Sequence, residues 1–298
     1  MGENVKARLY LASSMFIFGT IGIFRTFIPI SSGFIAFARG IIGTVFLLTL
    51  MLVMRKKVAI DAIKSNLTLL ALSGALIGFN WILLFESYKY TTVANATLCY
   101  YMAPIFVIAV SPFAFKERLT LKKTICVAVA LAGMACISGV YDITSLKATE
   151  ILGILLGLGA ALLYASVIVI NKKLRNISAY DRTITQLASA GVVMFAYVLA
   201  VEREAFAKLD FKITALLVLV GIIHTGIAYA LYFGSLEKLS AQTVAIFSYI
   251  DPVVAIILST LLLHDKMGLY EWVGAVLILG ATFISEISFK TEKGIQKA

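Results

Sequence analysis

Ten long stretches of apolar residues, separated by short polar links, dominate the hydrophobic pattern of the chain. Each is about 18–25 residues long, enough for an α-helix to cross roughly 30 Å of hydrocarbon. Barrel strands would be about ten residues long with alternating polarity, so continuous apolar runs in lipid indicate helices. The pattern predicts an all-α polytopic membrane protein with ten transmembrane helices. The stretches are Leu9–Ile28, Gly33–Met54, Leu67–Tyr88, Thr92–Phe115, Leu121–Val140, Ile151–Ile170, Ile184–Val201, Ile213–Leu236, Leu239–Leu263 and Leu269–Ser288.

The lysines and arginines concentrate in alternate links. Hydrophobic residues make up 61% of the 298 residues and charged residues 14%, too few to face water all round. With the N-terminus inside, 18 of the 26 basic residues fall in inner links and 6 in outer links. Cytoplasmic loops collect Lys and Arg, so we expect both termini in the cytoplasm of a prokaryote, in a multi-pass plasma (inner) membrane protein. The net charge of +10 is therefore a topology signal and indicates no nucleic-acid partner.

The second half of the chain repeats features of the first half at a shift of 148 residues. Pro104 falls on Pro252, and each proline stands 13 residues before an acid, Glu117 or Asp265. Five predicted helices form each half, and an odd number of crossings inverts the second half in the membrane. Inverted repeats are a recurring construction of secondary transporters, with the substrate site near the midplane. We predict a 5+5 fold with residues 1–141 as the first repeat, 142–150 as an external linker, 151–290 as the second repeat and 291–298 as a cytoplasmic tail.

Short motifs occur in both halves in the same order. Tyr101-Met-Ala-Pro104 precedes Lys116-Glu117-Arg118-Leu119-Thr120, and Ser248-Tyr249-Ile250-Asp251-Pro252 precedes His264-Asp265-Lys266. Phe18-Gly19-Thr20, Arg39-Gly40 and His224-Thr225-Gly226-Ile227-Ala228-Tyr229 accompany them. Over essentially its whole length, the chain resembles the two-copy EamA-domain transporters of the drug/metabolite transporter superfamily. The resemblance implies a ten-helix inverted repeat that exports or exchanges small metabolites.

Two ionisable side chains fall at mid-depth in the predicted helices. Ionisable groups in a membrane cost roughly 2.5–3.5 kcal/mol at the bilayer centre, which makes each a functional hypothesis. Asp251 is a candidate for proton coupling or for binding a substrate amine. Its alternative is a neutral carboxyl that hydrogen-bonds a neighbouring helix. His224 is a second proton-coupling candidate, or a ligand for a substrate carboxylate, or a satisfied buried histidine.

Two arginines lie near the outer ends of the first two predicted helices. Arg39 could turn inward to meet Glu86 in an ion pair that closes an outer gate, or form a purely structural pair, or snorkel outward. For Arg25 we expect a guanidinium that snorkels to the lipid headgroups. Pro104 and Pro252 each leave a carbonyl without its helical partner, so we predict kinks that act as hinges.

Polar and aromatic side chains at mid-depth are candidates for lining a substrate cavity. Tyrosines near helix ends have an alternative role in the interfacial belts. An aromatic cavity with one acid, one histidine and an arginine at its mouth would suit a zwitterion such as an amino acid. The predicted lining residues are Asn80, Trp81, Asn95, Thr97, Tyr101, Tyr164, His224, Tyr229, Gln242 and Tyr249.

The sequence thus predicts a secondary active transporter, an exporter or exchanger of small organic metabolites that works by alternating access. Proton coupling is a hypothesis, and an uncoupled facilitator is its alternative. The chain has no Gly-x-x-x-x-Gly-Lys-Ser/Thr loop for an ATP-driven pump, and two histidines cannot supply the clusters of an intramembrane enzyme. A non-transporting receptor or assembly partner is a further alternative. We expect no enzyme activity, no cofactor or metal, a small organic solute and the lipid bilayer as partners, and a monomer or homodimer.

Overall fold

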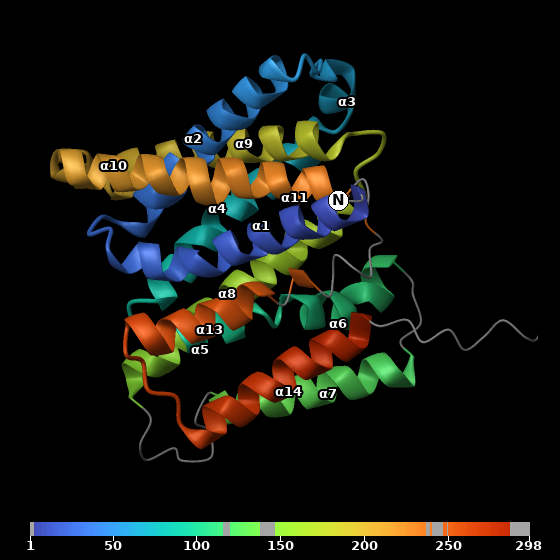
Figure 1. Ribbon diagram of the computed structural model, residues 1–298, viewed down its shortest axis with the longest axis vertical. Coiled ribbons are helices and arrows are strands. Elements are labelled where there is room, and N and C mark those ends of the chain that lie inside the picture. Colours follow the sequence, from blue (N-terminus) through green and yellow to red (C-terminus); the bar gives the residue numbers. More distant parts are fainter. Residues whose placement is uncertain are drawn as a thin grey trace, which may run out of the picture.

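Helices make up the regular secondary structure of the described residues, as the apolar pattern predicts (Figure 1). The computed structural model describes residues 3–115, 120–137, 147–236, 239, 247–248 and 250–286. Within those ranges there is no β-strand. The helices are α1 (Glu3–Thr26), α2 (Ser32–Val53), α3 (Ile60–Ser65), α4 (Leu67–Ser87), α5 (Val93–Tyr100), α6 (Ala103–Phe115), α7 (Leu121–Ile137), α8 (Ala148–Asn171), α9 (Ala179–Val201), η2 (Arg203–Lys208), α10 (Phe211–Val220), η3 (Gly221–Ile227), α11 (Ala228–Leu236), α13 (Ile250–Leu262) and α14 (Leu269–Glu286).

Seven helical segments of the described chain are long and apolar enough to cross a membrane. Three shorter apolar helices, Thr124–Cys136, Ile250–Leu262 and Leu269–Ala281, fall in the three remaining predicted stretches. Each of the ten stretches therefore contains an apolar helix, and the predicted all-helical membrane fold is confirmed. The seven long segments are Val5–Thr26, Ser32–Val53, Leu67–Ser87, Val93–Val110, Ala148–Asn171, Ala179–Val201 and Phe211–Ser235.

Two of these spans depart from a regular α-helix. In the span Val93–Val110, α5 ends at Tyr100 and α6 begins at Ala103, so Pro104 stands in the first turn of a new helix. Pro252 likewise stands in the first turn of α13. A proline is tolerated there because the first-turn amides have no helical partner. In the span Phe211–Ser235, the middle segment η3 is a π-helix. The hinge role of the two prolines stays a prediction.

Small residues let the helices approach closely at several crossings. α2 packs along α9, α4 packs on both α8 and α9, α1 packs on α11 and α13, and α7 lies beside α14 at one end of the molecule (Figure 1). A Cβ atom at Gly40 would lie 2.7 Å from the backbone nitrogen of Gly191, so the α2–α9 crossing requires glycine at this point. Such close backbone contacts take the place of a hydrophobic driving force between helices in lipid.

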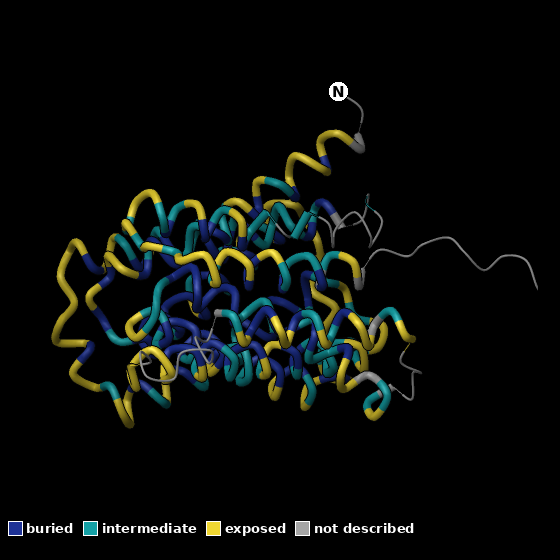
Figure 2. The backbone as a smooth tube through the Cα atoms, turned by 90° about the horizontal axis from the view of Figure 1, so that it is seen from below, coloured by how far each residue is buried: buried dark blue, intermediate teal, exposed yellow. Residues whose placement is uncertain are grey.

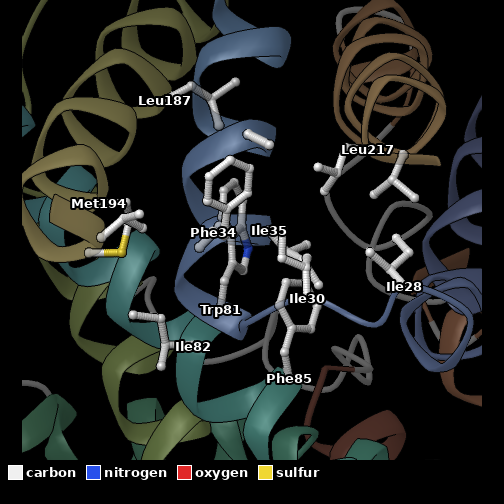
Figure 3. Close-up of a cluster of buried hydrophobic side chains, with 14 of the residues drawn as sticks. Ile28, Ile30, Phe34, Ile35, Trp81, Ile82, Phe85, Leu187, Met194 and Leu217 are labelled. Atoms are coloured by element: carbon white, nitrogen blue, oxygen red, sulfur yellow. The ribbon is translucent and has the colours of Figure 1, made fainter. Parts of the chain in front are cut away.

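Buried residues gather toward the interior of the molecule and exposed residues along its outside (Figure 2). Many of the exposed residues are large and apolar. One cluster of buried side chains joins α2, α4 and α9, with Phe34, Trp81 and Phe85 among its members (Figure 3). On the outer surface, Leu52 is 75% exposed and Phe113 is 88% exposed. An exposed apolar surface of this kind fits lipid as the solvent.

Candidate functional site

Arg39 is a buried cation that lies between α2, α4 and η3. It is 6% exposed. Its Nε donates to Thr225 Oγ1 at 3.1 Å, and its Cζ lies 4.1 Å from the centre of the Trp81 ring and 5.4 Å from that of Phe85. Gly43 makes room for this arrangement, because a Cβ there would lie 2.4 Å from Thr225 Cγ2. A hydroxyl and two aromatic rings therefore fix the guanidinium, with cation–π attraction from the rings.

His224, the neighbour of Thr225 in η3, bonds to α1. Its Nε2 lies 2.8 Å from Thr20 Oγ1, and the ring packs edge-on against Phe24 at 4.8 Å. The Thr20 hydroxyl donates its one proton to the carbonyl of Ile17 at 2.7 Å. Its oxygen therefore accepts from Nε2, and Nδ1 is left as an acceptor that is buried without a hydrogen-bond partner in the described structure.

Asp251 lies where α13 approaches α1 and the break between α5 and α6. A Cβ at Gly19 of α1 would lie 2.5 Å from the Asp251 carbonyl oxygen, so the two backbones almost touch. The Tyr101 hydroxyl donates to the carbonyl of Ser248 at 3.3 Å and lies within electrostatic reach of the Asp251 carboxylate. The interruption after Tyr100 thus lets a tyrosine of the first half reach the acid of the second half.

Two tyrosines lie near both Arg39 and Asp251. The ring of Tyr100 lies 5.5 Å from that of Tyr164. Tyr88 and Tyr100 are each within electrostatic reach of both Arg39 and Asp251. The site therefore holds one cation and one acid on helices from different halves of the chain, with the same two tyrosines near both.

The structure brings some of the predicted lining residues to this site and assigns others to helix packing. Trp81 lies under Arg39, and Tyr229 stacks on Phe233 at 5.8 Å. Asn80 donates to the carbonyl of Ala160 at 2.6 Å, a bond that joins α4 to α8. Three further side chains are placed as follows: Asn95 donates to Glu271 Oε1 at 2.8 Å, Thr97 is buried, and Tyr164 is 40% exposed. Gln242 and Tyr249 lie outside the described residues.

The two gate candidates have different partners. Glu86 accepts from Lys89 Nζ at 2.6 Å, and no pair between Arg39 and Glu86 occurs in the part of the chain that the structure describes. The arginine within electrostatic reach of Glu86 is Arg25. Its expected snorkelling is wrong: Arg25 is 7% exposed, because the turn after α1 brings the Ile28 carbonyl and the Ser32 hydroxyl to its two Nη atoms at 3.0 and 3.2 Å. A gate role for Arg39 and Glu86 stays a prediction.

Sequence reasoning missed Thr20, Tyr88, Tyr100 and Thr225 as members of the site. Tyr88 stands at the end of α4, where a tyrosine suggests the membrane interface. Tyr100 would point away from Tyr101 on an unbroken helix, and Thr225 reaches Arg39 from a π-helical turn. The helix break before Pro104 was the available signal for Tyr100; the sequence offers none for the π-helix.

The apolar spans, the interrupted helices and the buried charged site define a polytopic membrane protein of the transporter class. The chain belongs to the EamA-like transporter family, whose sequence model matches residues 5–139 and 151–286. Membership of this family indicates a membrane transporter for small solutes and not an enzyme.

Relatives by sequence include several bacterial transporters. The chain is 32% identical over 276 residues to the uncharacterized transporter YxxF of Bacillus subtilis, which covers 93% of this chain and 88% of that protein. It is 26% identical over 246 residues to a Salmonella typhimurium protein named "Probable amino-acid metabolite efflux pump", over 77% of this chain and 80% of that one. A solved crystal structure shares the fold, with a TM-score of 0.59 and 18% identity over 94% of this chain and 96% of that chain.

Proposed function

We propose that this protein is a secondary active transporter that exports or exchanges small zwitterionic metabolites, amino acids among them, by alternating access. The observation that carries the proposal is the placement of Arg39 on α2 and Asp251 on α13, with Tyr88 and Tyr100 within reach of both. A solute with one carboxylate and one ammonium group matches two opposite charges held on separate helices. Two relatives whose names include amino-acid metabolite efflux support the same substrate class.

Alternating access is proposed to rest on two inverted five-helix halves, residues 1–141 and 151–290. The pairs of spans that pack together support this. When each span is replaced by its counterpart in the other half, five spans away, one observed pair becomes another observed pair. The third span packs on the sixth (α4 on α8), and correspondingly the eighth packs on the first (α11 on α1). The first packs on the ninth (α1 on α13), and the sixth packs on the fourth (α8 on α5 and α6). The second span packs on the seventh (α2 on α9), and the fifth packs on the tenth (α7 on α14). Exchanging the two halves leaves each of these two pairs unchanged.

Two interhelical hydrogen bonds support the same relation. Asn80 donates to the carbonyl of Ala160 at 2.6 Å between the third and sixth spans. Ser14 donates to the carbonyl of Ala228 at 2.8 Å between the first and eighth spans. Ala228 is the residue that the 148-residue shift places on Asn80. Two halves that pack through matching contacts have inward-open and outward-open states of nearly equal energy, which is what alternating access requires.

Proton coupling is proposed to follow from competition at Asp251. A carboxylate that binds either a proton or a substrate ammonium group, but not both, exchanges one for the other across the membrane. The alternative mechanism, an uncoupled facilitator, would bind the same solutes without exchanging protons.

Both termini are assigned to the cytoplasmic side of the inner membrane by the excess of basic residues in the inner links.

Flux in proteoliposomes tests the function. We expect the reconstituted wild type to exchange radiolabelled L-leucine and to move it against its gradient when a pH gradient is imposed. Asp251→Asn should lose the component driven by the pH gradient at saturating leucine, and the matched variant Asp61→Asn, in exposed α3, should keep it. Absence of any wild-type flux would contradict the proposal that the protein is a transporter of these solutes. Unchanged pH-driven flux in Asp251→Asn would show that protons couple through another group, whereas wild-type leucine flux with no pH-driven component would leave the uncoupled facilitator as the mechanism.

A further inference from the structure

Arg39 carries a cationic group whose bonding capacity is mostly unused. A guanidinium has five N–H donors, and in Arg39 only Nε is bonded, to Thr225. Among the described residues neither Nη atom has an acceptor, and neither is fully enclosed. The side chain as a whole is 6% exposed, so this charge lies inside the protein. The edge of the guanidinium that carries the two Nη atoms, which we call the open edge, keeps a small accessible area.

Arg25 is a second buried arginine of the same fold, and both of its Nη atoms have acceptors within the protein, although its Nε is buried without a hydrogen-bond partner among the described residues. It is 7% exposed, its two Nη atoms donate to the Ile28 carbonyl and the Ser32 hydroxyl, and Glu86 and Glu202 are within electrostatic reach. Two protein acceptors and two nearby carboxylates therefore offset the burial of this charge. Arg39 has the same burial without a carboxylate partner in the described part of the chain, and a buried charge without a partner is costly.

The open edge of Arg39 is also held in position. Trp81 lies 4.1 Å from Cζ, Phe85 lies 5.4 Å away, and the bond to Thr225 fixes the rotation of the guanidinium plane. The fork of N–H donors matches the two oxygens of a carboxylate, and a fork fixed in advance loses little freedom when it binds.

We infer that Arg39 is the specificity-determining residue for the substrate carboxylate, which its two Nη atoms bind while Trp81, Phe85 and Thr225 hold it in position. The inference rests on the proposed function and assigns the anionic end of the same solute. Asp251 then takes the ammonium end. A solute with both groups makes both contacts, whereas a simple amine or a simple carboxylic acid makes only one of them.

A binding matrix on the purified full-length protein tests this role. The probes are L-leucine, isopentylamine, which lacks the carboxylate, and 4-methylpentanoate, which lacks the ammonium group. Calorimetric titration should show that Arg39→Gln weakens leucine and 4-methylpentanoate by about 10- to 100-fold and leaves isopentylamine unchanged. Asp251→Asn should instead weaken leucine and isopentylamine. Arg39→Lys keeps the charge but lacks the fork, and should fall between wild type and Arg39→Gln.

Arg25→Gln is the matched control, because it removes an equally buried arginine outside the site. It should lower thermal stability without changing the order of affinities for the three probes. Equal weakening of all three probes by Arg39→Gln would overturn the inference, and so would wild-type binding of isopentylamine as tight as that of leucine. If Arg39→Gln does not fold, Arg39→Lys provides the test. Leucine affinity in Arg39→Lys equal to that of the wild type would contradict recognition of the carboxylate by the two Nη atoms. Wild-type binding of inorganic phosphate, without binding of L-leucine or of 4-methylpentanoate, would also overturn the inference.

The two proposals fail separately. Loss of carboxylate selectivity in Arg39→Gln with no leucine flux in proteoliposomes would leave Arg39 as the anchor of a binding protein. Leucine flux with selectivity unchanged in Arg39→Gln would leave a transporter that binds the carboxylate elsewhere.

Discussion

Two junctions join loops of the two halves at opposite ends of α2 and α9, and they are built from different chemistry. In the first, which we call the Glu202 junction, the Glu202 carboxylate accepts from Ser31 Oγ at 2.6 Å and from the Phe34 amide at 3.1 Å. A residue just past the end of α9 thus caps the start of α2. Gly33 leaves room for this carboxylate, because a Cβ at that position would lie 2.5 Å from Glu202 Oε2 and would displace it.

In the second, the Asn66 junction, a neutral amide does most of the bonding. Asn66 donates through Nδ2 to the carbonyl of Arg175 at 3.0 Å and accepts the Arg175 amide at 3.2 Å. Asp181 adds a bond from the Ala59 amide at 3.3 Å, and it also bonds to Ser178 at the start of its own helix.

The difference indicates where the structure is sensitive to charge. The Glu202 junction depends on one carboxylate that faces a helix N-terminus, with Arg25 within electrostatic reach. The Asn66 junction depends chiefly on two reciprocal bonds between neutral groups, and a carboxylate, that of Asp181, adds one longer bond. In our proposed topology the Glu202 junction lies outside and the Asn66 junction inside, so the two closures of an alternating-access cycle would differ in their response to charge.

The largest effect is expected from removing the carboxylate. Glu202→Ala deletes both bonds to Ser31 and Phe34 and leaves the α2 N-terminus without its cap, at an expected cost of about 2–3 kcal/mol. Thermal unfolding in detergent measures the loss. Glu204→Ala, an exposed acid in η2, makes the same charge change without these bonds and should stay within about 0.5 kcal/mol of wild type. Equal stability of the two variants would show that the cap contributes nothing.

A smaller effect is expected at the other junction. Asn66→Ala removes the two reciprocal bonds to Arg175, which join neutral groups and are expected to contribute about 0.5–1 kcal/mol net each. We expect a loss of about 1–2 kcal/mol, measured in the same unfolding assay, with Thr68→Ala as an exposed polar control in α4. A loss larger than that of Glu202→Ala would reverse the ranking of the two junctions.

The sequence predicted the ten apolar segments because lipid requires each span to bond its own backbone, which leaves a long apolar run as the visible trace. Pro104 marked the interruption between α5 and α6 for a similar local reason, since proline lacks an amide. The π-helical segment η3 left no comparable trace, because its residues are as apolar as those of an ordinary span.

The partners of the charged residues could not be predicted. Glu202 reaches Ser31 across 171 positions of sequence, and Arg39 reaches Thr225 across 186. Each contact depends on how helices of different halves pack and on the turn that presents the side chain. The sequence identified Arg39 as unusual because it is a charged residue within a predicted span. Whether its partner is Glu86 or the ring of Trp81 could be decided only from the structure.

The smallest effect separates charge from hydrogen bonding at the Glu202 junction. Glu202→Gln keeps an oxygen that can accept from Ser31 and Phe34 but removes the charge, so we expect a loss of less than about 1 kcal/mol at low salt. Raising the ionic strength from about 0.05 to 0.5 M should destabilise the wild type and narrow this gap, because salt screens the carboxylate from the helix N-terminus and Arg25. In Asn66→Ala, where the Glu202 carboxylate is intact, the salt response should match that of the wild type. A Glu202→Gln variant with the wild-type salt response would mean that the junction is held by hydrogen-bond geometry alone, and that the two junctions do not differ in their sensitivity to charge.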